Sequence, residues 1–155
     1  MTPLRFNRRS ALALSSSALA GLAFPRILSA AGPPEMIAYR NPGCGCCSKW
    51  AMGLQADGFL VKLVDDTDLA GRRAAAGVPA DLAGCHTAFL GNYVIEGHVP
   101  SEDIVRFLKE KPDALGLAVP GMPLGSPGME TAGAPDKYDV ILFKADGSRR
   151  VFASH

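Results

Sequence analysis

Three of the four cysteines in this chain of 155 residues fall within four positions, in the segment Cys44-Gly45-Cys46-Cys47. Three thiols cannot be paired completely among themselves, and a disulfide between the adjacent Cys46 and Cys47 would be strained. Small domains that are held together by disulfides usually distribute their cysteines along the chain. The clustering therefore predicts metal binding or redox chemistry, and it argues against a fold that depends on structural disulfides.

Residues 1–31 have the pattern of an export signal, in which basic residues are followed by an apolar run and then by small residues suited to cleavage. The apolar run from Ala11 to Phe24 is too short to span a bilayer comfortably, so an uncleaved membrane anchor is the less favoured alternative. The pair Arg8-Arg9 resembles a twin-arginine signal, which is a receptor-read address for export. We expect the signal to be cleaved and residues 32–155 to be periplasmic, with no membrane span in the mature form.

Cleavage of this segment would change the charge balance of the protein. It removes four arginines and no acidic residue, so Lys+Arg falls from 16 to 12 while Asp+Glu stays at 15. A mildly acidic chain has no cluster of positive charge with which to displace counterions from phosphates. We therefore expect no nucleic-acid partner. The remaining residues, 32–155, suffice for one domain with one core.

The apolar runs and turn residues of the mature chain predict an α/β fold. Expected elements are a strand over 36–39, a helix over 47–56, a strand over 59–64, a short helix over 68–76, a hairpin over 87–90 and 93–95, a helix over 101–111 and a final hairpin over 138–144 and 149–152. The Gly- and Pro-rich stretch 118–135 is predicted to be irregular. This order is typical of a thioredoxin-like sandwich, here with a C-terminal Gly/Pro/Met-rich loop and a β-hairpin extension.

The cysteine cluster would then lie where a strand meets the beginning of a helix. Unpaired N–H groups and the helix dipole stabilise a thiolate there, and the thiolate is the form that binds metals and attacks disulfides. Cys44 and Cys47 have the spacing of a redox pair, whereas Cys44 and Cys46 could form a compact metal clamp. A third thiol is better explained as an additional ligand. Soft sulfur ligands favour Cu(I), and no second Cys-x-x-Cys or His-x-x-x-His segment of the kind that zinc sites use is present.

The fourth cysteine, Cys85, comes directly before the predicted third strand, in the segment Gly84-Cys85-His86-Thr87. In thioredoxin-like proteins this turn faces the Cys-x-x-Cys pair and usually contains a proline, whose place is taken here by His86. We expect Cys85 to be a metal ligand, the alternative being a small buried core residue. His86 is either a ligand or a histidine that is hydrogen-bonded locally.

Two methionines, Met122 and Met129, lie in the Gly/Pro-rich stretch, where no helix face is available to bury them. Thioether sulfur is a soft ligand, so each is a candidate copper ligand, but methionine is also a common gap-filler that could anchor the loop. His98 follows a predicted strand, and we interpret it as a hydrogen-bonded turn residue rather than a ligand.

Several blocks of the sequence, in order between about Met36 and Phe152, carry a family resemblance. The blocks are Tyr39-Arg40-Asn41-Pro42-Gly43-Cys44-Gly45-Cys46-Cys47, Cys85-His86-Thr87, Val94 to Pro100, Gly116 to Pro123 and Gly125 to Glu130. Taken together they resemble the CopG-like metal-binding proteins of proteobacterial copper-resistance clusters, a family formerly described as a domain of unknown function.

The resemblance implies a periplasmic thioredoxin-like protein that binds copper through Cys44, Cys46, Cys47 and Cys85 and acts in copper tolerance. Redox cycling of the metal is a further function that the family suggests. We expect Cu(I), as one or more ions because cysteine sulfur can bridge, and periplasmic copper-handling proteins as partners. A thiol-disulfide oxidoreductase that uses Cys44 and Cys47 is the alternative.

Overall fold

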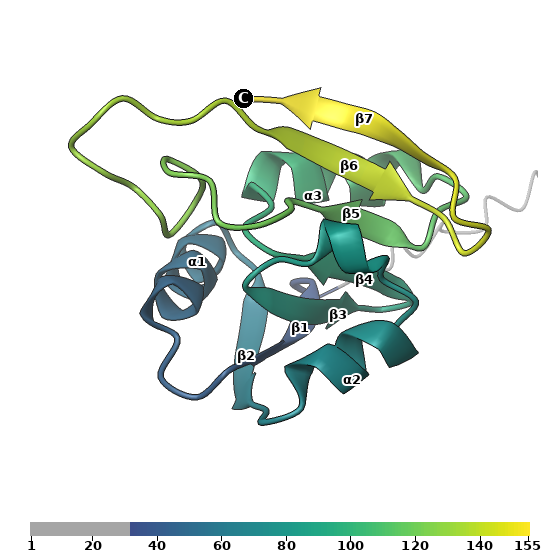
Figure 1. Cartoon of the computed structure of the whole chain (residues 1–155), viewed down its shortest axis with the longest axis horizontal. Helices are drawn as coiled ribbons and strands as arrows, with labels where there is room; N and C mark the ends of the chain where they lie inside the picture. Colours follow the sequence, from purple (N-terminus) through teal and green to yellow (C-terminus); the bar gives the residue numbers. More distant parts are fainter. Residues whose placement is uncertain (1–31) are drawn as a thin grey trace, which may run out of the picture. The chain divides into compact units, whose positions relative to one another are not determined.

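A computed structural model of the protein describes residues 32–155, and the predicted export signal over 1–31 lies outside them. The described part is a mixed α/β unit built around one sheet of seven strands, which confirms the predicted fold class (Figure 1). None of the helices in residues 32–155 has the length and apolar character needed to cross a membrane.

The elements follow the predicted order, with one additional strand, β5 (Gly116–Ala118), and one additional short helix, η1 (Ala80–Leu82). They are β1 (Glu35–Arg40), α1 (Gly45–Ala56), β2 (Leu60–Asp65), α2 (Leu69–Ala75), the short 3-10 helix η1 (Ala80–Leu82), β3 (His86–Leu90), β4 (Tyr93–Glu96), α3 (Ser101–Glu110), β5 (Gly116–Ala118), β6 (Asp139–Phe143) and β7 (Arg149–Ser154).

The strands lie in the order β2-β1-β3-β4-β5-β6-β7. β1 pairs with β2 and β4 pairs with β5 in parallel, and every other neighbouring pair is antiparallel. The thioredoxin-like interpretation concerns the first four strands, where a central β1 lies between β2 and β3. The final hairpin, β6 with β7, extends the sheet beyond them, as the predicted extension requires.

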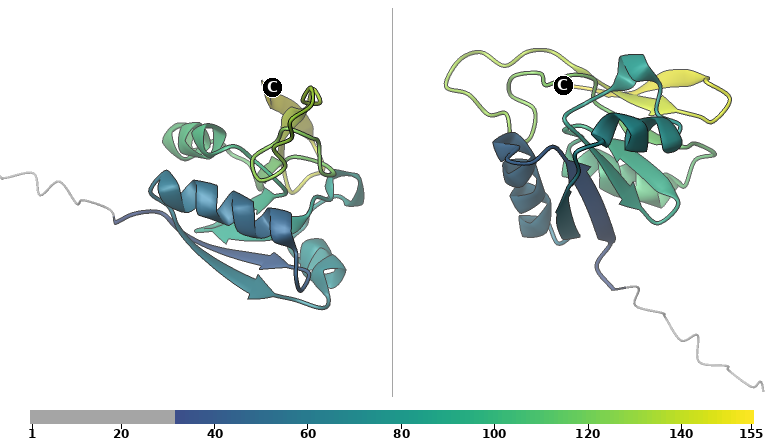
Figure 2. Two further views of the ribbon diagram at one scale, coloured as in Figure 1. Left: turned by 90° about the vertical axis from the view of Figure 1, so that its left-hand side faces the viewer. Right: turned by 60° about the horizontal axis from the view of Figure 1, so that its bottom comes forward.

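Helices cover both faces of the sheet, with α1 and α3 on one face and α2 on the other (Figure 2, left). Successive residues of a strand point to opposite faces, and the core divides accordingly. Ile95 joins the larger apolar cluster with Trp50 of α1 and Phe107 of α3, whereas its neighbour Val94 joins a second cluster with Leu82 of η1. Burial on both faces explains the continuous apolar runs Ala88 to Leu90 and Tyr93 to Ile95 in the central strands.

The strand β5 was missed by the sequence analysis, because three residues with a leading glycine carry no readable period. A Cβ atom on Gly116 would lie 1.8 Å from the carbonyl oxygen of Val94, so only glycine permits this close pairing with β4. The strand connects the C-terminal hairpin to the rest of the sheet through its antiparallel pairing with β6.

The chain between β5 and β6 contains no strand or helix, as predicted, and it passes over the beginning of α1 (Figure 2, right). Gly128 makes the closest approach. A Cβ atom there would lie 2.6 Å from the carbonyl oxygen of Cys46 and 2.7 Å from the backbone nitrogen of Trp50. The β5–β6 loop therefore lies directly against the cysteine segment.

Candidate functional site

The segment that carries three of the cysteines is shaped by a tight turn. Asn41 to Cys44 form this turn, in which Gly43 has φ +76° and the Cys44 N–H donates to the carbonyl of Asn41 at 3.2 Å. Proline followed by glycine with positive φ is the pattern of a type II turn. The helix α1 then begins at Gly45, two residues earlier than predicted, so the three sulfurs gather at its amino end.

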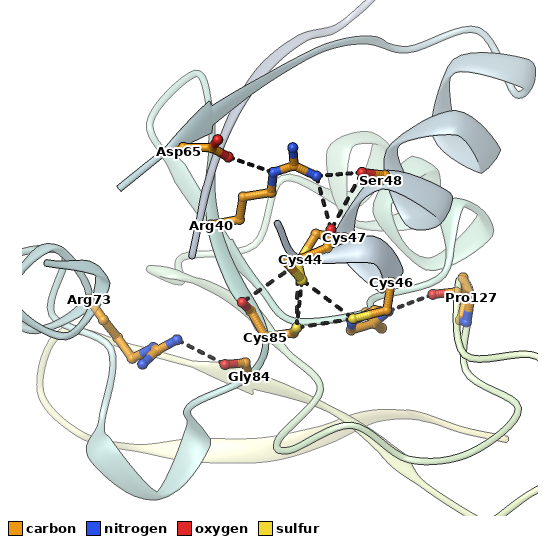
Figure 3. Close-up of a disulfide and its surroundings, with 11 residues drawn as sticks. Arg40, Cys44, Cys46, Cys47, Ser48, Asp65, Arg73, Gly84, Cys85 and Pro127 are labelled. Atoms are coloured by element: carbon orange, nitrogen blue, oxygen red, sulfur yellow. Dashed lines mark hydrogen bonds and ion pairs between the residues drawn. A yellow bond between two sulfur atoms is a disulfide. The ribbon is translucent and has the colours of Figure 1, made fainter. Parts of the chain in front are cut away.

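The fourth sulfur comes from a bend between η1 and β3 and meets the other three (Figure 3). The Cys85 sulfur lies 3.2 Å from that of Cys44, 3.2 Å from that of Cys46 and 3.4 Å from that of Cys47. All four sulfurs lie within 4.8 Å of one another. Cys47 is fully buried and the other three are half-buried, so the group lies at the edge of the core.

Two of the sulfurs are joined in this structure, since Cys44 and Cys47 form a disulfide, whereas Cys46 and Cys85 are free thiols. This pair has the spacing that the sequence analysis assigned to redox exchange. The arrangement therefore combines a reducible disulfide with two further thiols in contact with it.

The Cys85 thiol has a strongly perturbed acidity. Burial raises its pKa to about 12, and a hydrogen bond and negative charge from Cys46 act in the same direction, against the opposing charge of Arg73. A metal bound at Cys85 has to displace a proton that this site holds firmly, because the thiolate is the ligand form. Metal affinity at such a site is pH-dependent.

Two arginines, neither of which the sequence analysis singled out, hold the backbone beside the sulfurs. Arg40 donates to the carbonyl of Cys44 at 2.9 Å and also to the hydroxyl of Ser48. Arg73 donates to the carbonyl of Gly84 at 2.9 Å, and it pairs with Glu96, an acidic residue that the sequence analysis had left without a role. The signal that could have found Glu96 is an acidic residue directly after the apolar run Tyr93 to Ile95.

The two histidines near the site pack into the interior. His86 has no exposed surface, and its ring lies 4.0 Å from the Trp50 ring and 5.3 Å from that of His98. Neither nitrogen of His86 has a hydrogen-bond partner, whereas Nδ1 of His98 lies 2.6 Å from the carbonyl oxygen of Pro127. Burial lowers the pKa of both histidines, so both are neutral at pH 7.

Among residues 32–155, the side chains of His, Cys, Asp and Glu that gather as a possible metal site are the four cysteines, without His86. The assignment of His86 as a ligand stays a prediction. The hydrogen bond of His98 agrees with the interpretation of that residue as a bonded turn histidine.

The candidate methionines line two different hollows, each of which also includes one of the cysteines. Met122 is 55% exposed and lines a cavity of about 400 Å³ together with Cys85, Arg73 and Gly84. Met129 is half-buried and lines an open hollow with Cys46 and Glu130. Both thioethers therefore border an approach to the sulfurs from solvent, and their role as ligands stays a prediction.

Comparisons with known proteins identify similar chains. A family described as "Protein of unknown function, DUF411" matches residues 82–129, and no curated protein matches the sequence. Two solved structures titled "Copper resistance protein copG", in form 1 and form 2, are each 39% identical to this chain, with TM-scores of 0.75 and 0.76. Each match covers 79% of this chain and 98% of the solved chain. The resemblance found in the sequence is thus confirmed, and the chain belongs to the CopG family of copper-resistance proteins.

Proposed function

We propose that this protein is exported to the periplasm, where it binds Cu(I) through the thiolates of Cys44, Cys46, Cys47 and Cys85 and contributes to copper tolerance. The observation that carries the proposal is the convergence of four sulfurs within 4.8 Å from two distant segments of the chain. Thiolates are soft ligands that prefer Cu(I), and a sulfur in contact with three others is placed to bridge more than one ion.

Supporting features surround the sulfurs. Met122 and Met129 border the two approaches and would supply additional soft ligands during loading, and the exposure of Met122 suits transfer from a periplasmic copper-handling partner. Copper binding through all four thiolates requires that the Cys44–Cys47 disulfide is first reduced to two thiols, because a disulfide sulfur is not a thiolate.

The test is anaerobic copper uptake by reduced protein comprising residues 32–155. Metal analysis combined with thiol counting should give at least one Cu(I) per chain and four reactive thiols before loading. A ligand that binds only the native state at about 100 times its Kd stabilises that state by about 2.7 kcal/mol, so the melting temperature should rise with copper. Absence of copper uptake by the reduced protein would end the proposal.

The disulfide between Cys44 and Cys47 favours a second candidate, a thiol-disulfide oxidoreductase in which copper is incidental. Such an activity should need only these two thiols, survive the Cys85→Ser substitution and be insensitive to a copper chelator. A disulfide-reductase assay on wild-type protein and on Cys85→Ser, with and without chelator, decides between the two.

A copper oxidoreductase would combine both functions. In that reaction two Cu(II) ions each gain one electron, the Cys44–Cys47 dithiol loses two electrons and two protons, and the products are two Cu(I) ions and the disulfide. Catalytic acceleration of Cu(II) reduction in the presence of an external thiol is the corresponding measurement.

A further inference from the structure

Glu96 is a carboxylate with no exposed surface at the end of β4, and its hydrogen bonds converge on the segment that carries Cys85. Its Oε1 accepts from Nε of Arg73 and from the backbone N–H of Gly84, each at 2.7 Å. Its Oε2 accepts from the hydroxyl of Thr87 at 2.7 Å. Two of these contacts are therefore made to residues within two positions of Cys85.

Arg73 completes the arrangement from the other side, because its second nitrogen donates to the carbonyl of Gly84 at 2.9 Å (Figure 3). One ion pair thus holds both the N–H and the C=O of the residue that directly precedes Cys85. The bend has no helix or strand of its own to satisfy these groups, so the two side chains take the place of regular secondary structure.

The ion pair is not explained by stability alone. Removing two charges from water is costly, and well-packed apolar residues of similar size often stabilise a protein as much or more. Arg72, the preceding residue of the same helix, pairs instead with Asp66 at a more exposed position. The Arg73–Glu96 pair is more buried than the Arg72–Asp66 pair, and it also binds the backbone N–H and C=O of Gly84.

The surroundings leave the bend little freedom to shift. A Cβ atom on Gly84 would lie 2.6 Å from Cα of Gly97, and the N–H of Gly121 donates to the carbonyl of Ala83 at 2.9 Å. The backbone carbonyl of Glu96 itself accepts from the N–H of Val119 at 2.9 Å. Glu96 therefore joins the Cys85 bend to the end of β4 and to the beginning of the β5–β6 loop.

We infer that Arg73 and Glu96 form a positioning pair, which holds the Cys85 sulfur beside those of the 44–47 segment before any metal binds. This inference rests on the proposed copper-binding function of the four cysteines. Neither residue is a ligand. Residues that orient metal ligands typically change metal affinity by about 10- to 100-fold when they are substituted.

The first test compares Arg73→Lys and Glu96→Gln with Arg72→Lys as the matched control. Lysine keeps the charge of Arg73 but lacks the planar fork that reaches the carboxylate of Glu96 and the carbonyl of Gly84 together. In competition with a chromophoric Cu(I) chelator, Arg73→Lys and Glu96→Gln should bind about 10- to 100-fold more weakly than wild type. Arg72→Lys should bind like wild type, and circular dichroism should show all three variants folded.

A second test needs no copper. With Cys44 and Cys47 both replaced by serine, the remaining sulfurs of Cys46 and Cys85 lie 3.2 Å apart. One glutathione disulfide can then oxidise the two thiols to a protein disulfide and leave as two molecules of glutathione. The equilibrium constant measures how closely the fold holds the two sulfurs, and Arg73→Lys should lower it about tenfold, equivalent to ~1.4 kcal/mol.

An equilibrium constant within about twofold of the parent's for Arg73→Lys would overturn the positioning role, whatever the copper result, because that change is under ~0.5 kcal/mol. If Glu96→Gln does not fold, the result for Arg73→Lys alone decides whether the pair positions Cys85. Failure of wild-type protein to take up Cu(I) would overturn the proposed function only, since the glutathione measurement still decides whether the pair positions Cys85.

Discussion

The two segments that supply the sulfurs are held in place by different means. Residues 44–47 are placed by their own neighbours in sequence, through the turn at Pro42-Gly43 and the first turn of α1. Cys85 is placed by contacts with residues far from it in the chain, Arg73 and Glu96 among them. A local segment can form from its own sequence, whereas the distant one depends on the assembled fold.

The largest expected effect tests whether the two segments form one site at all. Cys46→Ser and Cys85→Ser should each weaken Cu(I) binding by at least about 100-fold, because a serine hydroxyl is neither soft nor ionised. Loss of a residue that only orients a ligand costs up to about 100-fold, and loss of a ligand should cost at least as much. The measurement is chelator competition with reduced protein. Wild-type affinity in Cys85→Ser would show that residues 44–47 bind copper without the distant segment.

The second prediction compares one glycine from each segment. A Cβ atom on Gly84 would meet backbone atoms of Gly97 and Val119 at 2.6 to 3.0 Å, whereas a Cβ on Gly45 would meet nothing within 4 Å. Gly84→Ala should therefore destabilise the reduced, metal-free protein by about 1–3 kcal/mol, as overpacking usually does. Gly45→Ala should be neutral or stabilise α1 by up to about 1 kcal/mol.

Urea unfolding of both alanine variants and wild type provides the measurement, and copper affinity provides a second readout. Copper affinity should fall in Gly84→Ala and stay unchanged in Gly45→Ala. Equal destabilisation by the two substitutions would contradict the view that the 44–47 segment is the more tolerant one.

The same division explains what the sequence could and could not predict. The turn at Pro42-Gly43, a helix soon after it and the strand predicted to begin at Thr87 follow from local patterns. The expectation that Cys85 lies opposite the cluster needed, in addition, the thioredoxin-like order of the elements. The Arg73–Glu96 pair joins residues of α2 and β4, and no spacing or period connects them. The strand β5 was missed for a related reason, since its three residues are a strand only because β4 and β6 lie on either side.

A third prediction concerns acid. Burial lowers the pKa of His86 and His98, so below pH 6.5 the unfolded chain binds protons that the folded protein does not. Stability must then fall as the pH falls through the unfolded pKa, by about 1 kcal/mol between pH 6.5 and 5.5 for His86, whose pKa is lowered furthest, and by less for His98, where the hydrogen bond to Pro127 and the charge of Glu130 oppose the effect of burial.

Urea unfolding of metal-free, reduced protein across this pH range should show the loss, and His86→Phe should remove the larger part of it while keeping an aromatic ring against Trp50. A pH dependence that His86→Phe leaves unchanged would place the titrating group elsewhere.

The smallest expected effect belongs to Arg40, the counterpart of Arg73 on the local segment. Its side chain is 17% exposed, and it pairs with Asp65, which is 53% exposed, at 2.9 Å, while donating to the carbonyl of Cys44. Such exposed pairs are worth about 0.2–1 kcal/mol. Because the turn and α1 already place residues 44–47, Arg40→Lys should change Cu(I) affinity by less than about threefold, which is ~0.65 kcal/mol.

The informative comparison is Arg40→Lys against Arg73→Lys under identical conditions. Both substitutions keep a positive charge beside the cluster and remove one fork-shaped contact to a backbone carbonyl next to a sulfur. Any difference in Cu(I) affinity between the two variants therefore reports on the positioning of the sulfurs, because the charge near the cluster is the same in both. If Arg40→Lys weakens copper binding as much as Arg73→Lys does, the 44–47 segment is not placed by its own sequence, and both halves of the site depend on the assembled fold.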